Sequence, residues 1–380
     1  MNKKKRVVIL GSFPIWLLEN DIPAARGHYA VWLMALHEML KEVQKYEWHW
    51  VCFNRNVSRK RDVVHANQVF HVLPCGSLEL ASRIRFMQDR WRVKRLLAQL
   101  KPDLVHAWGT ESRYASCGAD FNGKKILSMQ GILSACERIC PQGGYMKRQA
   151  AREVKLLPLF DVVTAESEWA CARCREVSPQ SRVIRWEYAT EDRFFHIERK
   201  LFDAPTCLLA GSDTPIKNVD TAIKVFADSR MAGVTLLLAG TDPAGRPDLP
   251  PNIKPLGRVS RDGMAELLSG CWALLHPSLV DSSPNIIKEA RVAGLPVVTT
   301  TNCGGAQYVD EGKSGYVVEA HDDEAMRQAV SDIVSSAPHA LQMGAWQQDV
   351  CRQQLSRETM KQRICEIYDA VLAEREANLR

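Results

Sequence analysis

The residues most able to do chemistry in this sequence gather in the segment 276–296. A short apolar run ends at His276, and a polar loop leads into a helical pattern that Gly294 stops. Asp281 lies in the loop, and Glu289 follows eight residues later, about one turn inside the helix. Free backbone amides at the start of such a helix favour an anion, and carboxylates accept hydrogen bonds from vicinal hydroxyls. We therefore expect a diphosphate or the polar edge of a sugar to bind here.

Lys217 lies in the loop Gly211-Ser212-Asp213-Thr214-Pro215-Ile216-Lys217-Asn218, and the family resemblance given below makes it a second candidate. A lysine ammonium can neutralise charge that develops on a leaving phosphate without a metal. The sequence contains no Asp-x-Asp pair that could hold a divalent cation, so we expect no metal. Cys136-x3-Cys140 with Cys171-x2-Cys174 has spacings that a zinc site could use, and zinc stays open as a minor alternative.

Short β-type runs that alternate with helical patterns must position these residues. The first series comprises 6–11, 48–53, 68–73, 104–108, 125–129, 162–165 and 183–186, and the second comprises 206–211, 234–240, 253–257, 273–276, 297–300 and 316–318. A polar stretch, 190–204, separates the two series. Such alternation is typical of parallel sheets, and a chain of 380 residues exceeds one ordinary core. The pattern therefore predicts two doubly wound α/β domains, followed by an amphipathic helix in the segment 356–379.

Residues 281–289 resemble the Glu-x7-Glu motif of family four retaining glycosyltransferases of GT-B fold, in its Ser-Pro-Asn variant. Asp281 stands where the first glutamate is usual. Residues 211–218 resemble the loop with which the family binds the donor diphosphate, and in it Ser212 replaces the usual arginine. More loosely, the segments 102–111 and 129–134 resemble a bacterial polysaccharide branch of the family. The resemblance implies two Rossmann-like domains that face each other across a cleft: an acceptor domain at 1–190 and a nucleotide-sugar donor domain at 191–355. The segment 356–380 would be a C-terminal helix that packs on its own domain or reaches back to the first.

By the same resemblance, the protein would move a hexose or N-acetylhexosamine from a nucleotide-diphosphate sugar to a glycan or lipid-linked acceptor, without a cofactor. Glu289 would hold the ribose hydroxyls, and Asp281 with the Ser283-Pro284-Asn285 backbone would address the transferred sugar. The resemblance implies Lys217, Asp281 and His106 as catalytic candidates, and Gly27, Gly211, Lys217, Arg258, Ser283, Pro284, Asn285 and Glu289 as donor-binding candidates. Arg258 would supply the charge that Ser212 lacks. For His106 and His28, a hydrogen-bonded structural role is an equal alternative.

Charge divides unevenly along the chain. Residues 1–190 carry 30 Lys and Arg against 18 Asp and Glu, whereas residues 191–380 carry 20 against 26. The run 83–95 is strongly basic and includes Trp91. If this run is a helix, it suits binding to an anionic membrane surface. The membrane-surface candidates are Arg83, Arg90, Trp91, Arg92 and Lys94. A solvated helix is the plain alternative, and we expect no nucleic-acid partner, because no recognition module accompanies the charge.

Composition favours a cytoplasmic protein. The basic start 1–6 is not followed by a long apolar core, and no window has the length of a membrane span. Twelve scattered cysteines suit a reducing compartment. We therefore expect a cytoplasmic location, with peripheral attachment at the inner face of the plasma membrane. Ser212 and Asp281 leave two other functions open: a GT-B nucleotide-sugar epimerase or hydrolase, and a non-catalytic nucleotide-sugar-binding partner.

Overall fold

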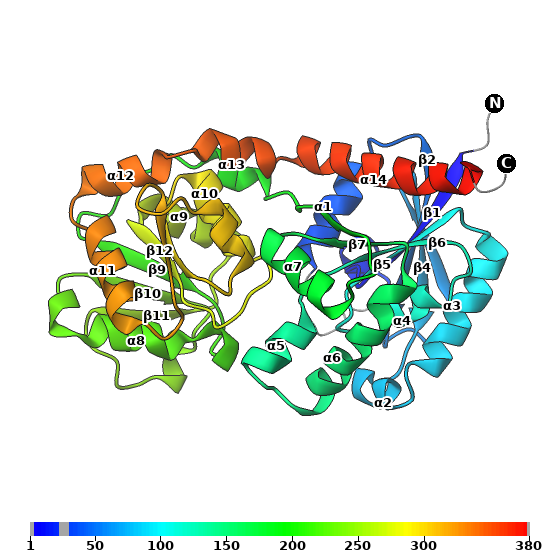
Figure 1. Ribbon diagram of the computed structural model, residues 1–380, viewed down its shortest axis with the longest axis horizontal. Helices are drawn as coiled ribbons and strands as arrows, with labels where there is room; N and C mark the ends of the chain where they lie inside the picture. The colour runs from blue at the N-terminus through cyan, green and yellow to red at the C-terminus, as the bar shows by residue number, and fades with distance from the viewer. Residues whose placement is uncertain (1–3, 23–29, 378–380) are drawn as a thin grey trace. The chain divides into compact units, whose positions relative to one another are not determined.

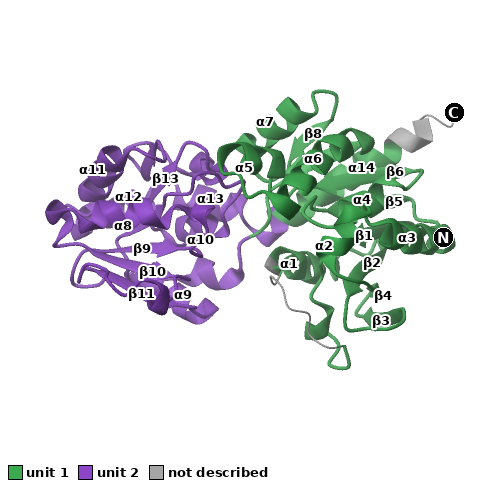
Figure 2. Cartoon of the chain, turned by 90° about the horizontal axis from the view of Figure 1, so that it is seen from below, with its two compact units in different colours: residues 1–189, 360–380 green, residues 190–359 purple. Residues whose placement is uncertain are grey.

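Two parallel-type sheets, each covered by helices, organise the chain, and Figure 1 shows how strands and helices alternate along it. The computed structural model describes residues 4–22 and 30–377. The chain divides into unit 1, which comprises residues 1–189 and 360–380, and unit 2, which comprises residues 190–359 (Figure 2). The candidates Gly27 and His28 lie outside the described residues.

Unit 1 contains a sheet of eight strands in the order β3-β4-β2-β1-β5-β6-β7-β8. The strands are β1 (Lys5–Leu10), β2 (Tyr46–Asn54), β3 (Arg61–His65), β4 (Gln68–Pro74), β5 (Leu104–Trp108), β6 (Lys124–Ser128), β7 (Val162–Ala165) and β8 (Val183–Arg185). Only β3 pairs antiparallel, with β4, among the strands of this sheet that the structure describes. Because helices cover both faces, β5 is buried along its whole length, as expected of a central parallel strand.

The helices of unit 1 lie between these strands, and the last one comes from the end of the chain. They are α1 (Val31–Leu40), α2 (Leu78–Arg83), α3 (Met87–Leu100), α4 (Tyr114–Ala119), α5 (Leu133–Ile139), α6 (Gly144–Leu156), α7 (Glu168–Val177) and α14 (Arg357–Ala377). From Met360 onward, α14 belongs to unit 1. Its buried side chains Ile364, Tyr368 and Val371 lie in the same core as β1 and β2, so this core joins residues more than 300 positions apart in sequence.

Unit 2 contains a six-stranded parallel sheet in the order β11-β10-β9-β12-β13-β14. Its strands are β9 (Thr206–Ala210), β10 (Thr235–Ala239), β11 (Ile253–Gly257), β12 (Ala273–His276), β13 (Val297–Thr300) and β14 (Gly315–Val318). Its helices are α8 (Val219–Ala227), α9 (Arg261–Gly270), α10 (Asn285–Ala293), α11 (Asp323–Ile333), α12 (Ala337–Ala345) and α13 (Gln348–Gln354). Leu208, Leu274 and Val297 come from three neighbouring strands and share one buried cluster with α10.

The structure confirms the predicted α/β class with doubly wound parallel sheets, and each predicted β-type run contains a strand. Two local features differ from expectation. The antiparallel strand β3 was not predicted, because its exposed, charged face lacks the apolar character of a buried strand. The basic run 83–95 is not one helix, since Arg85 and Phe86 adopt φ values of 53° and 56° and separate α2 from α3.

None of the helices in the described part of the chain is long and apolar enough to cross a membrane.

Candidate functional site

The strand order of unit 2 reverses direction between β9 and β12, at the carboxyl edge of its sheet. The chain runs from β9 outward through β10 and β11, then crosses to β12 on the other side of β9. Loops that follow neighbouring strands β9 and β12 therefore leave the same edge in opposite directions. In open parallel sheets, ligands bind at such a switch point. The two loops here are the segments 211–218 and 277–284, which carry Lys217 and Asp281.

Lys217 and Asp281 form an ion pair at this switch point. Lys217 Nζ donates to Asp281 Oδ2 over 2.6 Å, and His276 Nε2 lies 3.3 Å from the same oxygen. Burial alone would raise the pKa of Asp281, but Lys217 and His276 outweigh it and hold that pKa below its usual range. Asp281 is therefore an anion at neutral pH. Two sequence candidates 64 residues apart thus meet in one place.

Hydrogen bonds to backbone carbonyls fix both loops beside this pair. Asn218, with a left-handed φ of 53°, donates from Nδ2 to the carbonyls of Pro277 and Ala320, each over 3.0 Å. Leu279 N donates to Ile216 O over 2.9 Å. Asparagine tolerates the left-handed conformation better than most residues. These contacts hold the two loops together at the edge of the sheet.

Gly211 and Gly240 pass each other closely at the edge of the same loop. Gly240 has a φ of +95°, and a Cβ on it would lie 2.7 Å from Gly211 O. A side chain at Gly240 would displace the loop that carries Lys217, since both the space and the φ value require glycine. Ser212 is exposed, and its Oγ lies 3.3 Å from Thr214 Oγ1. Because serine is neutral, it does not supply the positive charge of the arginine that it replaces.

The start of α10 provides polar groups next to Asp281. Its N-cap residue is Pro284, and no side chain caps the first turn, so the first backbone amides remain available. Ser283 Oγ is buried and has no hydrogen-bond partner in the described residues. An unsatisfied buried hydroxyl costs free energy unless a ligand or water pairs with it. This helix start can therefore accept an anionic or hydroxyl-bearing ligand.

Glu289, on the second turn of α10, is paired with an arginine that the sequence reasoning missed. Arg261 Nη2 donates to Glu289 Oε1 over 2.7 Å and reaches Glu191 Oε1 at 2.7 Å, while its guanidinium stacks 4.7 Å from the Phe194 ring centroid. Burial raises the pKa of Glu289, and Arg261 opposes that shift. Arg261 thus keeps a nearly buried carboxylate available as an acceptor.

Arg258 was the cation expected near the donor, and its role stays a prediction. Its side chain is exposed and forms no ion pair among the described residues. A further arginine stands beside the Lys217 loop instead: Arg246 pairs with Asp213 at 2.9 Å and with Asp220 at 2.7 Å. No sequence motif marks Arg246 or Arg261. The one signal in the sequence that could have pointed to Arg261 is its place in the first turn of a helix, three residues after Arg258.

His106 lies inside the core of unit 1 and not at its surface. Its side chain is fully buried, with Nδ1 2.6 Å from Tyr368 Oη and Nε2 2.6 Å from Ser128 Oγ. Burial lowers the pKa of His106 to about 3, so the ring is neutral. This geometry favours the structural alternative, and a catalytic role for His106 stays a prediction.

Glu111 is a titratable side chain at the carboxyl edge of the unit 1 sheet. It is half-buried after β5, and Gly131 N donates to its Oε1 over 2.7 Å. Burial raises the pKa of Glu111 to about 7, and the nearby Glu153 adds to that shift. Glu153 is buried but satisfied by Thr110, Ser134 and the Leu133 amide. Glu111 ends the segment 102–111, to which the sequence analysis gave no side-chain role other than that of His106.

The membrane-surface candidates separate into exposed and paired residues. Trp91 is 58% exposed, together with Ile84 at 50% and Met87 at 64%. Arg90, in contrast, is bound through two nitrogens to Asp120, and Arg92 donates to Pro74 O over 3.0 Å and to Asp89. Arg83 and Lys94 remain exposed. The structure thus presents an apolar surface at the α2–α3 junction but commits two of the expected cations to internal contacts.

Comparisons with known proteins agree with this arrangement. Residues 204–336 match the family described as "Glycosyl transferases group 1". Over 140 residues the chain is 30% identical to the lipopolysaccharide glucosyltransferase WaaG of Escherichia coli (strain K12). The aligned segment covers 34% of this chain and 37% of that protein. The match thus spans little more than a third of that relative's length. The family match contains Lys217, Asp281, Arg261 and Glu289.

Solved structures show the same fold over nearly the whole chain. Sucrose-phosphate synthase from Thermosynechococcus elongatus matches with a TM-score of 0.80 and 16% identity, covering 98% of this chain and 100% of that chain. Anabaena HepE in complex with UDP and glucose matches with a TM-score of 0.69 and 16% identity, covering 96% of this chain and 100% of that chain. The predicted GT-B fold is confirmed.

Proposed function

We propose that this protein is a retaining, metal-independent glycosyltransferase that uses a nucleotide-diphosphate sugar. The observation that carries the proposal is the convergence of the Lys217–Asp281 pair and the uncapped start of α10 at the switch point of the unit 2 sheet. The family match over 204–336 supports it, because that segment contains each of these residues. The nucleotide sugar is a substrate, and no cofactor takes part.

Each part of the site has a task in this proposal. The donor diphosphate binds at the start of α10, where free amides and Lys217 offset its charge. Asp281 accepts a hydrogen bond from a hydroxyl of the transferred sugar, Ser283 donates one to it, and Pro284 and Asn285 place the backbone there. Glu289, held by Arg261, accepts hydrogen bonds from the ribose hydroxyls. Lys217 then stabilises the nucleotide diphosphate as it leaves.

The basic half of the chain and the relatives support a proposal for the acceptor and the location. We infer a hexose or N-acetylhexosamine transfer to a glycan or lipid-linked acceptor in bacterial surface polysaccharide synthesis, since WaaG is named a lipopolysaccharide glucosyltransferase. Exposed Trp91, Ile84 and Met87 support peripheral attachment to an anionic membrane on its cytoplasmic side. No disulfide joins any of the cysteines among the described residues, which agrees with a reducing compartment.

Binding and turnover with candidate donors test this proposal. The full chain is screened by thermal shift against uridine, guanosine and adenosine diphosphate sugars, and the donor that shifts the melting temperature is then assayed for release of its nucleoside diphosphate. We expect one donor class to stabilise the wild type and to be turned over, with both effects reduced in Lys217→Ala. No shift with any donor would refute a nucleotide-sugar site.

Ser212 and Asp281 favour a second candidate, because each departs from the family pattern at the diphosphate or sugar position. A nucleotide-sugar epimerase or hydrolase would alter the donor without an acceptor, whereas a non-catalytic partner would bind it unchanged. Chromatographic analysis of the donor after incubation without acceptor separates these outcomes. Donor conversion without acceptor at the rate seen with acceptor indicates the epimerase or hydrolase, and binding without any conversion indicates the non-catalytic partner.

A further inference from the structure

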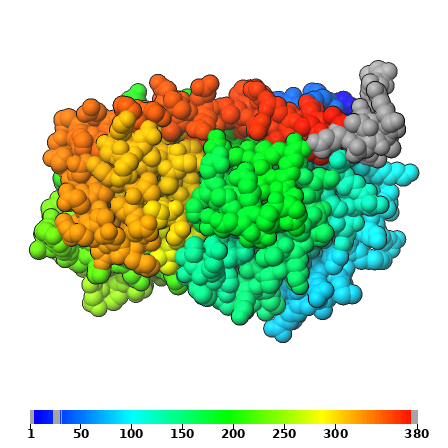
Figure 3. All heavy atoms as spheres, viewed as in Figure 1, coloured from blue at the N-terminus to red at the C-terminus, as the bar shows by residue number. Residues whose placement is uncertain are grey.

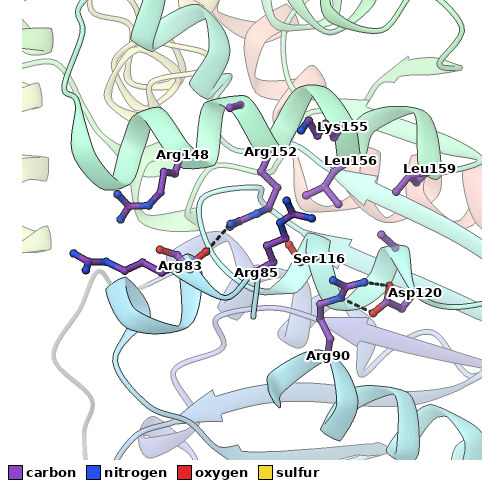
Figure 4. A pocket seen from close by; sticks show the side chains of 13 residues that line it. Arg83, Arg85, Arg90, Ser116, Asp120, Arg148, Arg152, Lys155, Leu156 and Leu159 are labelled. Atoms are coloured by element: carbon purple, nitrogen blue, oxygen red, sulfur yellow. Dashed lines mark hydrogen bonds and ion pairs between the residues drawn. The ribbon is translucent and has the colours of Figure 1, made fainter. Parts of the chain in front are cut away.

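A basic cavity of about 450 Å³ lies in unit 1, between the α2–α3 junction, α4 and α6. Figure 4 shows Arg148, Arg152 and Lys155 on α6 opposite Arg83, Arg85 and Arg90. On the surface of unit 1, the light blue to cyan α2–α3 segment adjoins the teal to green α5–α6 segment (Figure 3). The cavity is part of unit 1 alone, so it is separate from the Lys217–Asp281 site of unit 2.

The positive charge of this cavity exceeds the negative charge available to balance it. Six cationic side chains line the cavity among the described residues, against the single carboxylate of Asp120. Asp120 is taken by Arg90, which binds it through both Nε and Nη2. Outside the lining, Glu79 is shared between Arg83 and Arg148. Neither acid is left for the remaining three cations.

Arg152 is the most committed of these three cations. It donates to Ser82 O over 2.7 Å and to Gln149, both neutral acceptors, and its guanidinium stacks 4.9 Å from the Phe86 ring centroid. Burial lowers the pKa of Arg152, and the charges of Arg85, Arg148 and Arg90 lower it further. The protein therefore holds a guanidinium in place at a position that its own charges disfavour.

Arg85 and Lys155 are exposed and have no partner among the described residues. Arg85 and the fully buried Phe86 both have left-handed φ values. Residues without glycine's freedom hold this conformation only where packing enforces it, and such strain clusters at binding sites. Phe86 provides the packing here, under Arg152. In Figure 4 the Arg85 side chain points into the cavity.

We propose that this cavity binds a phosphate group, held by Arg85, Arg152 and Lys155. Guanidinium groups pair with phosphate oxygens through two parallel hydrogen bonds, and a lysine adds a point charge. A phosphate monoester or diphosphate would supply the negative charge that Asp120 and Glu79 do not. Ala119, Leu156 and the half-exposed Leu159 line the other part of the cavity, where they can contact the apolar portion of a phosphorylated molecule.

The phosphate could belong to a soluble molecule or to a lipid headgroup, and both arms of the test use the full chain. In the first arm, isothermal titration calorimetry measures inorganic pyrophosphate binding. In the second, sedimentation measures binding to phosphatidylcholine vesicles with and without phosphatidic acid. The test variant is Arg85→Gln with Lys155→Gln, because neither side chain has a partner whose loss would unfold the protein. Arg55→Gln with Arg59→Gln removes the same charge from exposed positions of unit 1.

We expect the test variant to lose at least about tenfold in affinity for pyrophosphate, for phosphatidic acid vesicles or for both, as loss of charge-assisted hydrogen bonds requires. The arm that shows the loss identifies the source of the phosphate, and the control variant should bind like the wild type. Lys217→Ala, tested in parallel, removes any pyrophosphate bound in unit 2. Three outcomes would overturn the cavity proposal: a loss of binding confined to Lys217→Ala, equal losses in the test and control variants, or no binding in either arm. None of these outcomes bears on turnover of the donor at the unit 2 site.

Discussion

Lys217 Nζ donates to Asp281 Oδ2 over 2.6 Å, and this contact joins the loop after β9 to the loop after β12. Both side chains are largely buried, with 28% and 16% of their surfaces exposed. In the proposed function, the ammonium of this pair offsets the charge of the donor diphosphate. It thereby connects the geometry of unit 2 to the proposed leaving-group chemistry.

Lys217→Ala should lower donor turnover about 100-fold or more, as expected when a group that stabilises developing charge is removed. Turnover is measured as nucleoside diphosphate release. Lys217→Arg keeps the charge and is the matched control, with a smaller loss. If Lys217→Ala keeps wild-type kcat, leaving-group stabilisation by this residue is excluded.

Glu289→Gln should raise the donor KM about tenfold, because one charge-assisted hydrogen bond to a ribose hydroxyl becomes a weaker one. The sharper test compares a normal donor with its 2′-deoxy and 3′-deoxy ribose analogues. The wild type should discriminate against the deoxy analogues, and Glu289→Gln should discriminate less. Equal discrimination in both proteins would show that Glu289 does not contact the ribose. Arg261→Met should produce a partial version of the same effect through loss of the Glu289 contact.

Tyr368→Phe should destabilise unit 1 by about 1–3 kcal/mol, since it leaves the buried Nδ1 of His106 without its partner. Urea denaturation measures this loss, and donor turnover should stay near the wild-type value below the unfolding transition. Phe at position 368 preserves the packing, so the lost hydrogen bond is isolated. A large fall in kcat without a fall in stability would instead assign His106 a role in the chemistry.

Stability should fall as pH rises through the region in which Glu111 titrates. The folded-state pKa of Glu111 is raised to about 7, above the ordinary value of 4.5. The native state therefore binds more protons than the unfolded state between these pH values, and the stabilisation present below pH 4.5 is lost as pH passes 7. Glu111→Gln should flatten this dependence in urea denaturation at pH 5 and pH 8. An unchanged slope would show that Glu111 is not its source.

Trp91→Ala should weaken binding to anionic vesicles in flotation experiments, because the exposed indole at the α2–α3 junction would lose its contact with the membrane interface. Arg90→Ala should have a smaller effect, since Asp120 already binds that guanidinium. The double variant should therefore resemble Trp91→Ala alone. Unchanged flotation for Trp91→Ala would reject membrane attachment through this surface.

The sequence by itself determined the α/β alternation, most strand positions and the identity of Lys217, Asp281 and Glu289 as candidates. The fold inferences succeed because burial on both faces of a parallel strand leaves a continuous apolar run, and because helix starts have local signals. The roles of Lys217, Asp281 and Glu289 stay predictions. The same reasoning predicted one helix for the run 83–95. It was wrong because hydrophobic periodicity carries no signal for the left-handed conformation of two consecutive residues, Arg85 and the buried Phe86.

Only the tertiary structure decided which charged residues are free and which are paired. Asp120 lies 30 residues from Arg90, and Arg261 lies 28 residues from Glu289, so no local pattern links them. The structure likewise buried His106 beneath Tyr368, 262 residues away. Hydrogen bonds and ion pairs form between side chains that the strand order brings together, and that order is a property of the whole sheet rather than of any segment of the sequence.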